Sequence, residues 1–321
     1  MTGADWKNEY NTLTELIILN IMKNLKFNRR NFLKTGSLAM GLTALNKNSL
    51  FAKSRNAAFT ESRIKLSLAA YSFNSMFRNG ELTMDEFIDY CDELKLDGTE
   101  LTSYYFESEE DSYLLGLRNK CFHLGLDISG TAIGNNFVTA DRAKRKEEVE
   151  NVKGWIDKAA VLGAPTIRVF GGYEIPDGYT EKDAFEWVIS SLQECVEYAG
   201  RKGIVLAIEN HGGFPTTSAQ VIHIVHEIDS PWFGVNLDTG NFANDWYRQI
   251  AELAPYAVVV QVKVKLKSTV EGAKPITTDA EQIIRILKNE GYRRYVALEY
   301  EENQPYEEIP IWIDRLKTCI G

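Results

Sequence analysis

The distribution of apolar residues along the chain constrains its fold more than any other feature. From Ile64 onward, eight short segments rich in branched apolar side chains each lead into a segment with helical periodicity. Strands that alternate with helices pair in parallel, and eight such units in about 260 residues match a single (β/α)8 TIM barrel in number and size. An open, doubly wound sheet is the alternative, although it rarely needs eight regular units.

The predicted elements follow one another without a low-complexity linker, so residues 63–321 are predicted to form one domain. Three predicted helices open with a capping box, in which Thr83, Thr217 and Thr278 each precede a Glu or Gln by three residues. The predicted strands are residues 64–73, 99–102, 126–132, 166–170, 204–210, 233–238, 258–267 and 295–300.

Residues 1–52 are predicted to form an N-terminal extension that contains a signal peptide. The pair Arg29-Arg30 precedes an uncharged, largely apolar run over residues 35–45, and a small-residue cleavage point ends at Ala52. This order is typical of an export signal, and the twin arginines favour the Tat route to the periplasm. The apolar run has 11 residues, too few to span a bilayer, so no stable membrane insertion is expected. Met22 is the expected natural start.

The charge distribution limits the classes of partner. Residues 1–52 hold seven Lys and Arg against three Asp and Glu, whereas the remaining residues hold 29 against 42, a net charge of −13. Nucleic-acid binding requires clustered Lys and Arg on the folded domain, so no nucleic-acid partner is expected. The oligomeric state is not predicted.

The cysteines are scattered and form no C-x-x-C pair. Cys91, Cys121, Cys195 and Cys319 each lie in a predicted helix among apolar residues. Such cysteines are expected to be buried structural thiols, although an oxidising compartment leaves one disulfide open.

Polar side chains interrupt the last predicted strands at regular positions. In VVVQVKVKLK, residues 258–267, the side chains of Gln261, Lys263 and Lys265 recur at every second position and therefore point to one face. A strand buried on both faces would be apolar throughout, so this face is either solvent or a polar site. In a barrel, catalytic groups lie at the carboxyl ends of the strands.

Three other strands place a carboxylate at the same depth. Glu209, Asp238 and Glu299 are each the last residue on the inward-facing side of their predicted strand. His211 lies two residues after Glu209. Burying three carboxylates at one barrel mouth without a counter-charge costs roughly several kcal/mol per ion. Lys263 neutralises one carboxylate but not all three, so a divalent metal ion is the simplest explanation. For each carboxylate alone, a solvated strand end is the alternative.

These segments also resemble a known family. IENHGG (208–213), VNLDTGN (235–241), QVK (261–263) and ALE (297–299) are similar, as an ordered set, to motifs of the xylose-isomerase-like TIM barrels, which include sugar and sugar-phosphate isomerases and epimerases. In that family the first Glu, the Asp, a His two residues before the Lys, and the last Glu bind one divalent metal ion. The resemblance therefore implies metal ligands at Glu209, Asp238, Gln261 and Glu299.

The sequence departs from the family pattern at two of these positions. Gln261 stands where the family usually has His, and Asn241 stands where many members have another His. An amide oxygen is a weaker donor than an imidazole nitrogen, and an all-oxygen site favours Mn²⁺ or Mg²⁺ over Zn²⁺.

The resemblance implies a mechanism of proton abstraction from a sugar through a metal-stabilised enediolate. Glu209 and Glu299 are then expected to act as general base and acid, and Lys263 is expected to offset the charge that develops on oxygen. Binding of sugar hydroxyl groups is expected from four further residues. They are His211, Arg168, Glu100 and Asn241.

Export favours a free sugar, a keto-sugar or a glycoside as the substrate, because phosphorylated sugars are chiefly cytoplasmic. Two alternatives to isomerase or epimerase activity remain open. One is a metal-dependent lyase or hydrolase of keto-glycosides, since elimination starts with the same proton abstraction. The other is a periplasmic sugar-binding barrel without turnover, which the two missing histidines would suit.

Overall fold

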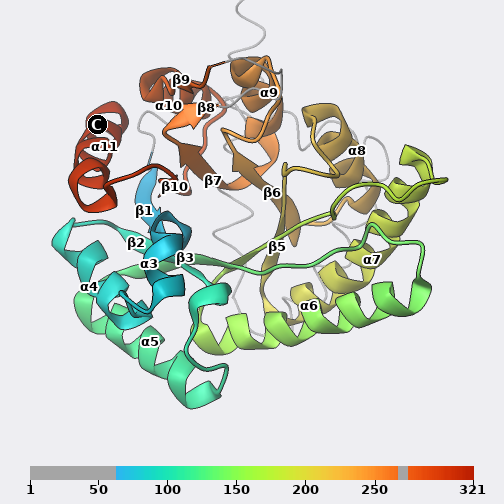
Figure 1. Cartoon of the computed structure of the whole chain (residues 1–321), viewed down its shortest axis with the longest axis horizontal. Coiled ribbons are helices and arrows are strands. Elements are labelled where there is room, and N and C mark those ends of the chain that lie inside the picture. Colours follow the sequence, from blue (N-terminus) through green and yellow to red (C-terminus); the bar gives the residue numbers. More distant parts are fainter. Residues whose placement is uncertain (1–62, 267–273) are drawn as a thin grey trace, which may run out of the picture. The chain divides into compact units, whose positions relative to one another are not determined.

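The computed structural model describes residues 63–266 and 274–321, and the predicted signal peptide in residues 1–52 lies outside this range. Eight parallel strands form a closed barrel, in the order β1-β10-β7-β6-β5-β4-β3-β2 (Figure 1). The barrel strands are β1 (Lys65–Ala69), β2 (Gly98–Thr102), β3 (Asp127–Ala132), β4 (Thr166–Val169), β5 (Val205–Glu209), β6 (Phe233–Asp238), β7 (Ala257–Lys263) and β10 (Tyr295–Glu299).

Closure of the barrel is visible in the pairing of the first strand. Leu68 in β1 lies beside Leu298 in β10 on one side and beside Thr99 in β2 on the other. The prediction of a single (β/α)8 TIM barrel is therefore confirmed, and the open sheet is excluded.

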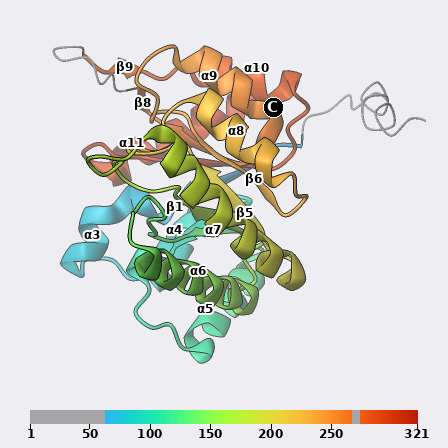
Figure 2. The ribbon, with the colours of Figure 1, turned by 90° about the vertical axis from the view of Figure 1, so that its right-hand side faces the viewer.

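Helices lie on the outside of the strands, as the turned view in Figure 2 shows. They are α3 (Asn74–Asn79), α4 (Met84–Glu93), α5 (Asp111–Leu124), α6 (Arg142–Leu162), α7 (Glu181–Lys202), α8 (Ser218–Ile228), α9 (Trp246–Leu253), α10 (Ala280–Asn289) and α11 (Pro305–Ile320). Within the described residues, none of these helices is long and apolar enough to cross a bilayer.

Local sequence signals set several helix ends. The capping boxes at Thr83 and Thr217 form as predicted, and Gly203 ends α7 in the left-handed region at φ 74°. The box predicted at Thr278 is wrong. Asp279 caps α10 by accepting from the Gln282 amide, while the Thr278 hydroxyl donates to the Lys263 carbonyl.

The carboxyl end of β7 also differs from the prediction of one strand over residues 258–267. The barrel strand stops at Lys263, and the short strand β8 (Lys265–Leu266) pairs antiparallel with β9 (Ile276–Thr277). The Thr278 amide donates to the Val264 carbonyl at 3.0 Å and holds this bend. Lys265 therefore leaves the inward row; its side chain is exposed and pairs with Glu302 at 2.6 Å.

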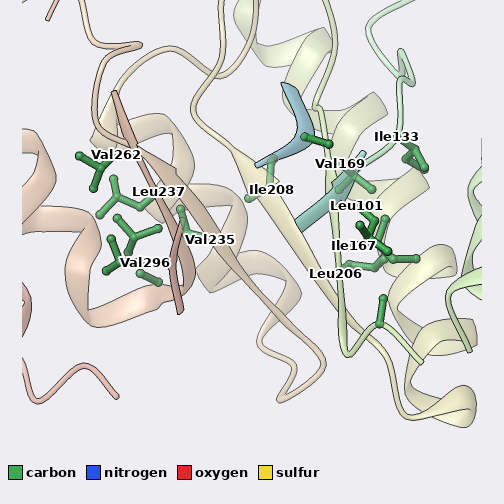
Figure 3. Close-up of a cluster of buried hydrophobic side chains, with 14 of the residues drawn as sticks. Leu101, Ile133, Ile167, Val169, Leu206, Ile208, Val235, Leu237, Val262 and Val296 are labelled. Carbon is green, nitrogen blue, oxygen red and sulfur yellow. The ribbon is translucent and has the colours of Figure 1, made fainter. Parts of the chain in front are cut away.

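Apolar side chains fill the layer between the strands and the helices, where burial of apolar surface stabilises the fold. The residues that Figure 3 labels in this layer are Leu101, Ile133, Ile167, Val169, Leu206, Ile208, Val235, Leu237, Val262 and Val296. Ser67 and Thr166 alternate along their strands with apolar residues of this layer and face the lumen. The Ser129 hydroxyl donates to Ser67 at 3.2 Å, and the Thr166 hydroxyl donates to the Ser129 carbonyl.

Candidate active site

The barrel register brings the predicted site residues together at the carboxyl ends of the strands. Asp238 lies beside Gln261, and Glu299 lies beside Lys263, and paired residues on parallel strands point to the same face. Glu209, at the end of β5, lies beside Asn236 in β6. All of these side chains are buried, with exposed fractions of 7% or less. The period of two along these four strands therefore placed these residues on one face correctly, with the exception of Lys265.

Lys263 is the central cation of this row. Its Nζ lies 2.9 Å from Glu299 Oε2, 3.3 Å from Asp238 Oδ2 and 2.6 Å from Glu301 Oε1. Only the contact with Glu301 has the alignment of a hydrogen bond; the Asp238 and Glu299 oxygens are buried without one. The single ammonium thus shares its positive charge among three carboxylates.

The DTG segment after β6 holds the Lys263 stem in place. The Thr239 hydroxyl accepts from the Lys263 backbone amide at 3.0 Å. A Cβ at position 240 would lie 2.5 Å from Lys263 Cγ, so only glycine fits there. Asn210, from the IEN segment, bonds to both the amide and the carbonyl of Asp238. These motifs therefore position Asp238 and Lys263 through the backbone.

Glu209 is held by a second group of side chains. Arg168 Nε lies 3.0 Å from Glu209 Oε2, and both side chains are almost fully buried. Glu209 Oε1 accepts from Asn241 Nδ2 and from His211 Nδ1, each at 2.9 Å. Three of the four predicted sugar-binding residues therefore contact the predicted base itself. His211 also lies against the ring of Phe170, at 4.4 Å between centroids.

Gln261 bridges the lumen from β7 to β2. Its Nε2 donates to Glu100 Oε1 at 2.7 Å, and its Oε1 accepts from Asn236 Nδ2 at 2.6 Å. Both ends of the amide are engaged with buried partners, so Gln261 is held rigidly in this arrangement. Glu100, the fourth predicted sugar-binding residue, thereby joins the same network.

The pKa values of the buried carboxyl groups are shifted in different directions by their surroundings. Burial and then the nearby Glu299 raise the pKa of Glu100 to about 7. Burial also raises the pKa of Asp238 and of Glu299, and Lys263 offsets this only in part. Burial acts in the same direction on Glu209, but the charge of Arg168 and the hydrogen bond from His211 outweigh it, so the pKa of Glu209 is lowered.

The site carries more negative than positive groups. Four buried carboxyl groups, on Glu100, Glu209, Asp238 and Glu299, face two buried cations, Arg168 and Lys263. Asp238 Oδ2 and Glu299 Oε2 lack hydrogen-bond partners. This all-oxygen donor set suits a hard divalent cation such as Mn²⁺ or Mg²⁺. As arranged, however, no three His, Cys, Asp or Glu side chains of the described residues surround a common point that would hold a metal ion.

Three residues at the site escaped the sequence-based prediction. Glu301 directly follows the last predicted strand, residues 295–300, and no pattern in the sequence indicates its contact with Lys263. Tyr71, two residues after the end of β1, places its ring 5.8 Å from Lys263 Nζ. The Tyr104 hydroxyl accepts from Arg168. Tyr104 follows the predicted strand 99–102 by two residues, and this position could have indicated it, whereas Tyr71 lay inside the strand predicted over residues 64–73.

Comparison with known proteins agrees with this architecture. A model of the xylose isomerase-like TIM barrel family matches residues 88–317, and no curated protein matches in sequence. A D-psicose 3-epimerase with D-tagatose from Clostridium cellulolyticum H10 is similar in structure, with a TM-score of 0.67 and 15% identity over 80% of this chain and 100% of that one.

Two further solved structures are similar. A 3-keto-D-glucoside 4-epimerase from E. coli has a TM-score of 0.62 and 15% identity, over 80% of this chain and 100% of that one. A probable 3-DHS dehydratase from Bacillus anthracis has a TM-score of 0.63 and 15% identity, over 79% and 99%. At such identities these likenesses show the fold alone. The family match covers more than half of the sequence, and the chain belongs to the xylose isomerase-like TIM barrel family.

Proposed function

We propose that the barrel mouth is the active site of a divalent-metal-dependent sugar isomerase or epimerase. One observation carries the proposal. Glu209 and Glu299 are buried carboxyl groups on strands three places apart in the barrel, and each is paired with a different cation, Arg168 or Lys263. Two acids held separately around one lumen suit proton removal on one side of a substrate and delivery on the other.

The residues then divide the work as follows. Glu209, whose charge is stabilised by Arg168, His211 and Asn241, takes the proton from a carbon beside the carbonyl. Glu299 returns a proton to the neighbouring or opposite position. The Lys263 ammonium offsets negative charge that develops on the substrate oxygen.

Glu209, Asp238, Gln261 and Glu299 would hold the metal ion, which would supply Lewis-acid polarisation of substrate oxygens. Three features support this proposal: the family to which the chain belongs, the oxygen-only donor set and the two unbonded carboxylate oxygens. The solved relatives that act on D-psicose and on a 3-keto-D-glucoside make a free sugar, a keto-sugar or a glycoside the substrate class to test.

The test is a screen of free sugars and keto-glycosides in deuterated water with added Mn²⁺ or Mg²⁺. Turnover is expected to place deuterium on a sugar carbon, and Glu209→Gln and Glu299→Gln are each expected to abolish this. Glu302→Gln is the matched control, because Glu302 pairs with Lys265 outside the lumen. Full activity after exhaustive chelation would refute the metal-dependent scheme. Sugar binding without any exchange would instead identify a binding barrel.

A second candidate function is elimination from a keto-glycoside. It is favoured by the structural likeness to a dehydratase as well as to a 3-keto-glucoside epimerase. Glu209 would take the proton beside the carbonyl, the C–O bond to the leaving group would break, and Glu299 would protonate the leaving oxygen to give the alcohol. Release of the aglycone, measured by chromatography, separates this reaction from epimerisation.

The identity of residue 261 offers a test of the ligand set. Gln261→His is expected to tighten divalent-ion binding and to shift preference towards Zn²⁺ or Co²⁺, because imidazole is the stronger donor. Unchanged affinity in a metal titration would show that Gln261 remains a bridge between Glu100 and Asn236 and is not a ligand.

A further inference from the structure

The ammonium group of Lys263 lies against two of the carboxylates that the proposed function assigns to the metal ion. These are Asp238, at 3.3 Å, and Glu299, at 2.9 Å. The third carboxylate in contact, Glu301, is not among the assigned ligands and lies closest, at 2.6 Å. One cation of the chain itself thus shares oxygens with the proposed site.

The quality of these contacts differs. Lys263 donates an aligned hydrogen bond to Glu301, whereas Asp238 Oδ2 and Glu299 Oε2 receive none. The contact with Glu301 is the shortest of the three and is an aligned, charge-assisted hydrogen bond, so Glu301 can keep the ammonium when it leaves the other two oxygens. The other two oxygens remain available as ligands once the ammonium withdraws from them.

Only the end of the Lys263 side chain is free to withdraw. Its backbone amide bonds to the Thr239 hydroxyl, and its Cβ and Cγ pack against Gly240. The Glu301 side chain lies at the edge of the site and is 29% exposed, whereas that of Asp238 is fully buried. A shift of Nζ towards Glu301 therefore moves charge from the buried oxygens towards the rim.

We propose that Lys263 is a built-in competitor of the divalent ion and that Glu301 is the positioning residue that retains the ammonium when the ion enters. This inference rests on the proposed metal site. An ammonium and a divalent cation repel each other and cannot both neutralise the same two oxygens. The Lys263–Glu301 pair would then set how tightly the ion is held.

The test is a double-mutant cycle on Mn²⁺ binding at one fixed pH, with free Mn²⁺ measured by electron paramagnetic resonance. Lys263→Met is expected to bind Mn²⁺ about tenfold more tightly than the wild type, and Glu301→Gln about tenfold less tightly. In the Lys263→Met background, Glu301→Gln is expected to have little effect, because there is no ammonium left to retain. Lys265→Met and Glu302→Gln, a neighbouring ion pair of the same 2.6 Å length, are the matched controls.

Each result decides between these roles. Equal weakening by Glu301→Gln in both backgrounds would show that Glu301 acts through its charge alone, and would overturn the inference while leaving the metal site intact. Equal affinity of wild type and Lys263→Met would also overturn it. Failure of every variant to bind Mn²⁺ would overturn the metal site as well.

If Lys263→Met does not fold, the wild type itself carries the test. With lysine side chains labelled at ¹⁵N, Mg²⁺ is expected to shift the Lys263 Nζ resonance, assigned with Lys263→Arg. In the Glu301→Gln protein this resonance is expected to shift only at higher Mg²⁺ concentration. A resonance that Mg²⁺ leaves unchanged would refute the displacement of the ammonium.

Discussion

Removal of Arg168 tests whether Glu209 depends on a buried counter-charge. In Arg168→Met, the Glu209 carboxylate loses the guanidinium 3.0 Å away, at a place where both side chains are 7% exposed or less. Breaking a buried ion pair by removing one partner costs about 3–5 kcal/mol of folding stability. His211 and Asn241 still donate to Glu209, so we expect a loss of about 3 kcal/mol.

Urea unfolding at pH 7, followed by far-ultraviolet circular dichroism, measures this loss. The control is Arg201→Met, because the Arg201–Glu197 pair has the same 3.0 Å length but side chains that are 62% and 76% exposed. That change is expected to cost less than about 0.5 kcal/mol. The double variant Arg168→Met with Glu209→Gln is expected to recover part of the loss, because the unpaired charge is gone.

The sign of the pH dependence follows from the lowered pKa of Glu209. The stability that Glu209 contributes is present above its unfolded pKa of about 4.5 and is lost as pH falls through its lower folded pKa. The destabilisation by Arg168→Met is therefore expected to be smaller below pH 4 than at pH 7. A loss at pH 7 no larger than that of Arg201→Met would refute the reasoning.

Three further predictions concern other parts of the chain. Asp127→Asn removes the bonds from Lys65 and Tyr295 that lower the pKa of Asp127, so its melting temperature at pH 7 is expected to fall relative to the wild type. The difference, measured by calorimetry, is expected to shrink as pH falls through that lowered pKa. Under native conditions at pH 7, only Cys319 is expected to react with a thiol reagent, because burial raises the pKa of the other thiols to about 12; fast reaction of all four would contradict this. Replacing the pair Arg29-Arg30 with two lysines is expected to keep the protein out of the periplasm on cell fractionation, whereas unchanged export would exclude the Tat route.

Much of the fold was predictable because it depends on local patterns. Alternating strands and helices, capping residues and strand length are set within about 20 residues, and they predicted a closed eight-stranded barrel. The inward row ending in Glu209, Asp238 and Glu299 followed from the period of two along each strand. The predicted strand over residues 258–267 was too long, because the polar and apolar residues of VKVKLK (262–267) continue to alternate beyond Lys263, where the barrel strand ends. The bend there depends on Thr278, which is distant in the sequence.

The arrangement within the site was less predictable, because it depends on contacts between residues far apart in the chain. Gln261 bonds to Glu100, which lies 161 residues earlier, and no pattern near either residue indicates the pair. The approach of Glu301 to Lys263 depends on the path of the chain after β10. Sequence periodicity predicts the face of the strand on which a side chain lies, but it does not predict which of the neighbouring side chains it will bind.

The bridge that Gln261 makes between Glu100 and Asn236 also limits which substitutions position 261 can accept. A neutral histidine at position 261 has one donor and one acceptor nitrogen, so an imidazole that used one of them as a metal ligand would leave Glu100 or Asn236 without its hydrogen bond in a buried place, at a cost of about 1–3 kcal/mol. A change to a metal-binding imidazole at position 261 is thus penalised until a second position mutates as well. Descendants of this chain are expected to keep glutamine, or to exchange the three residues as a block.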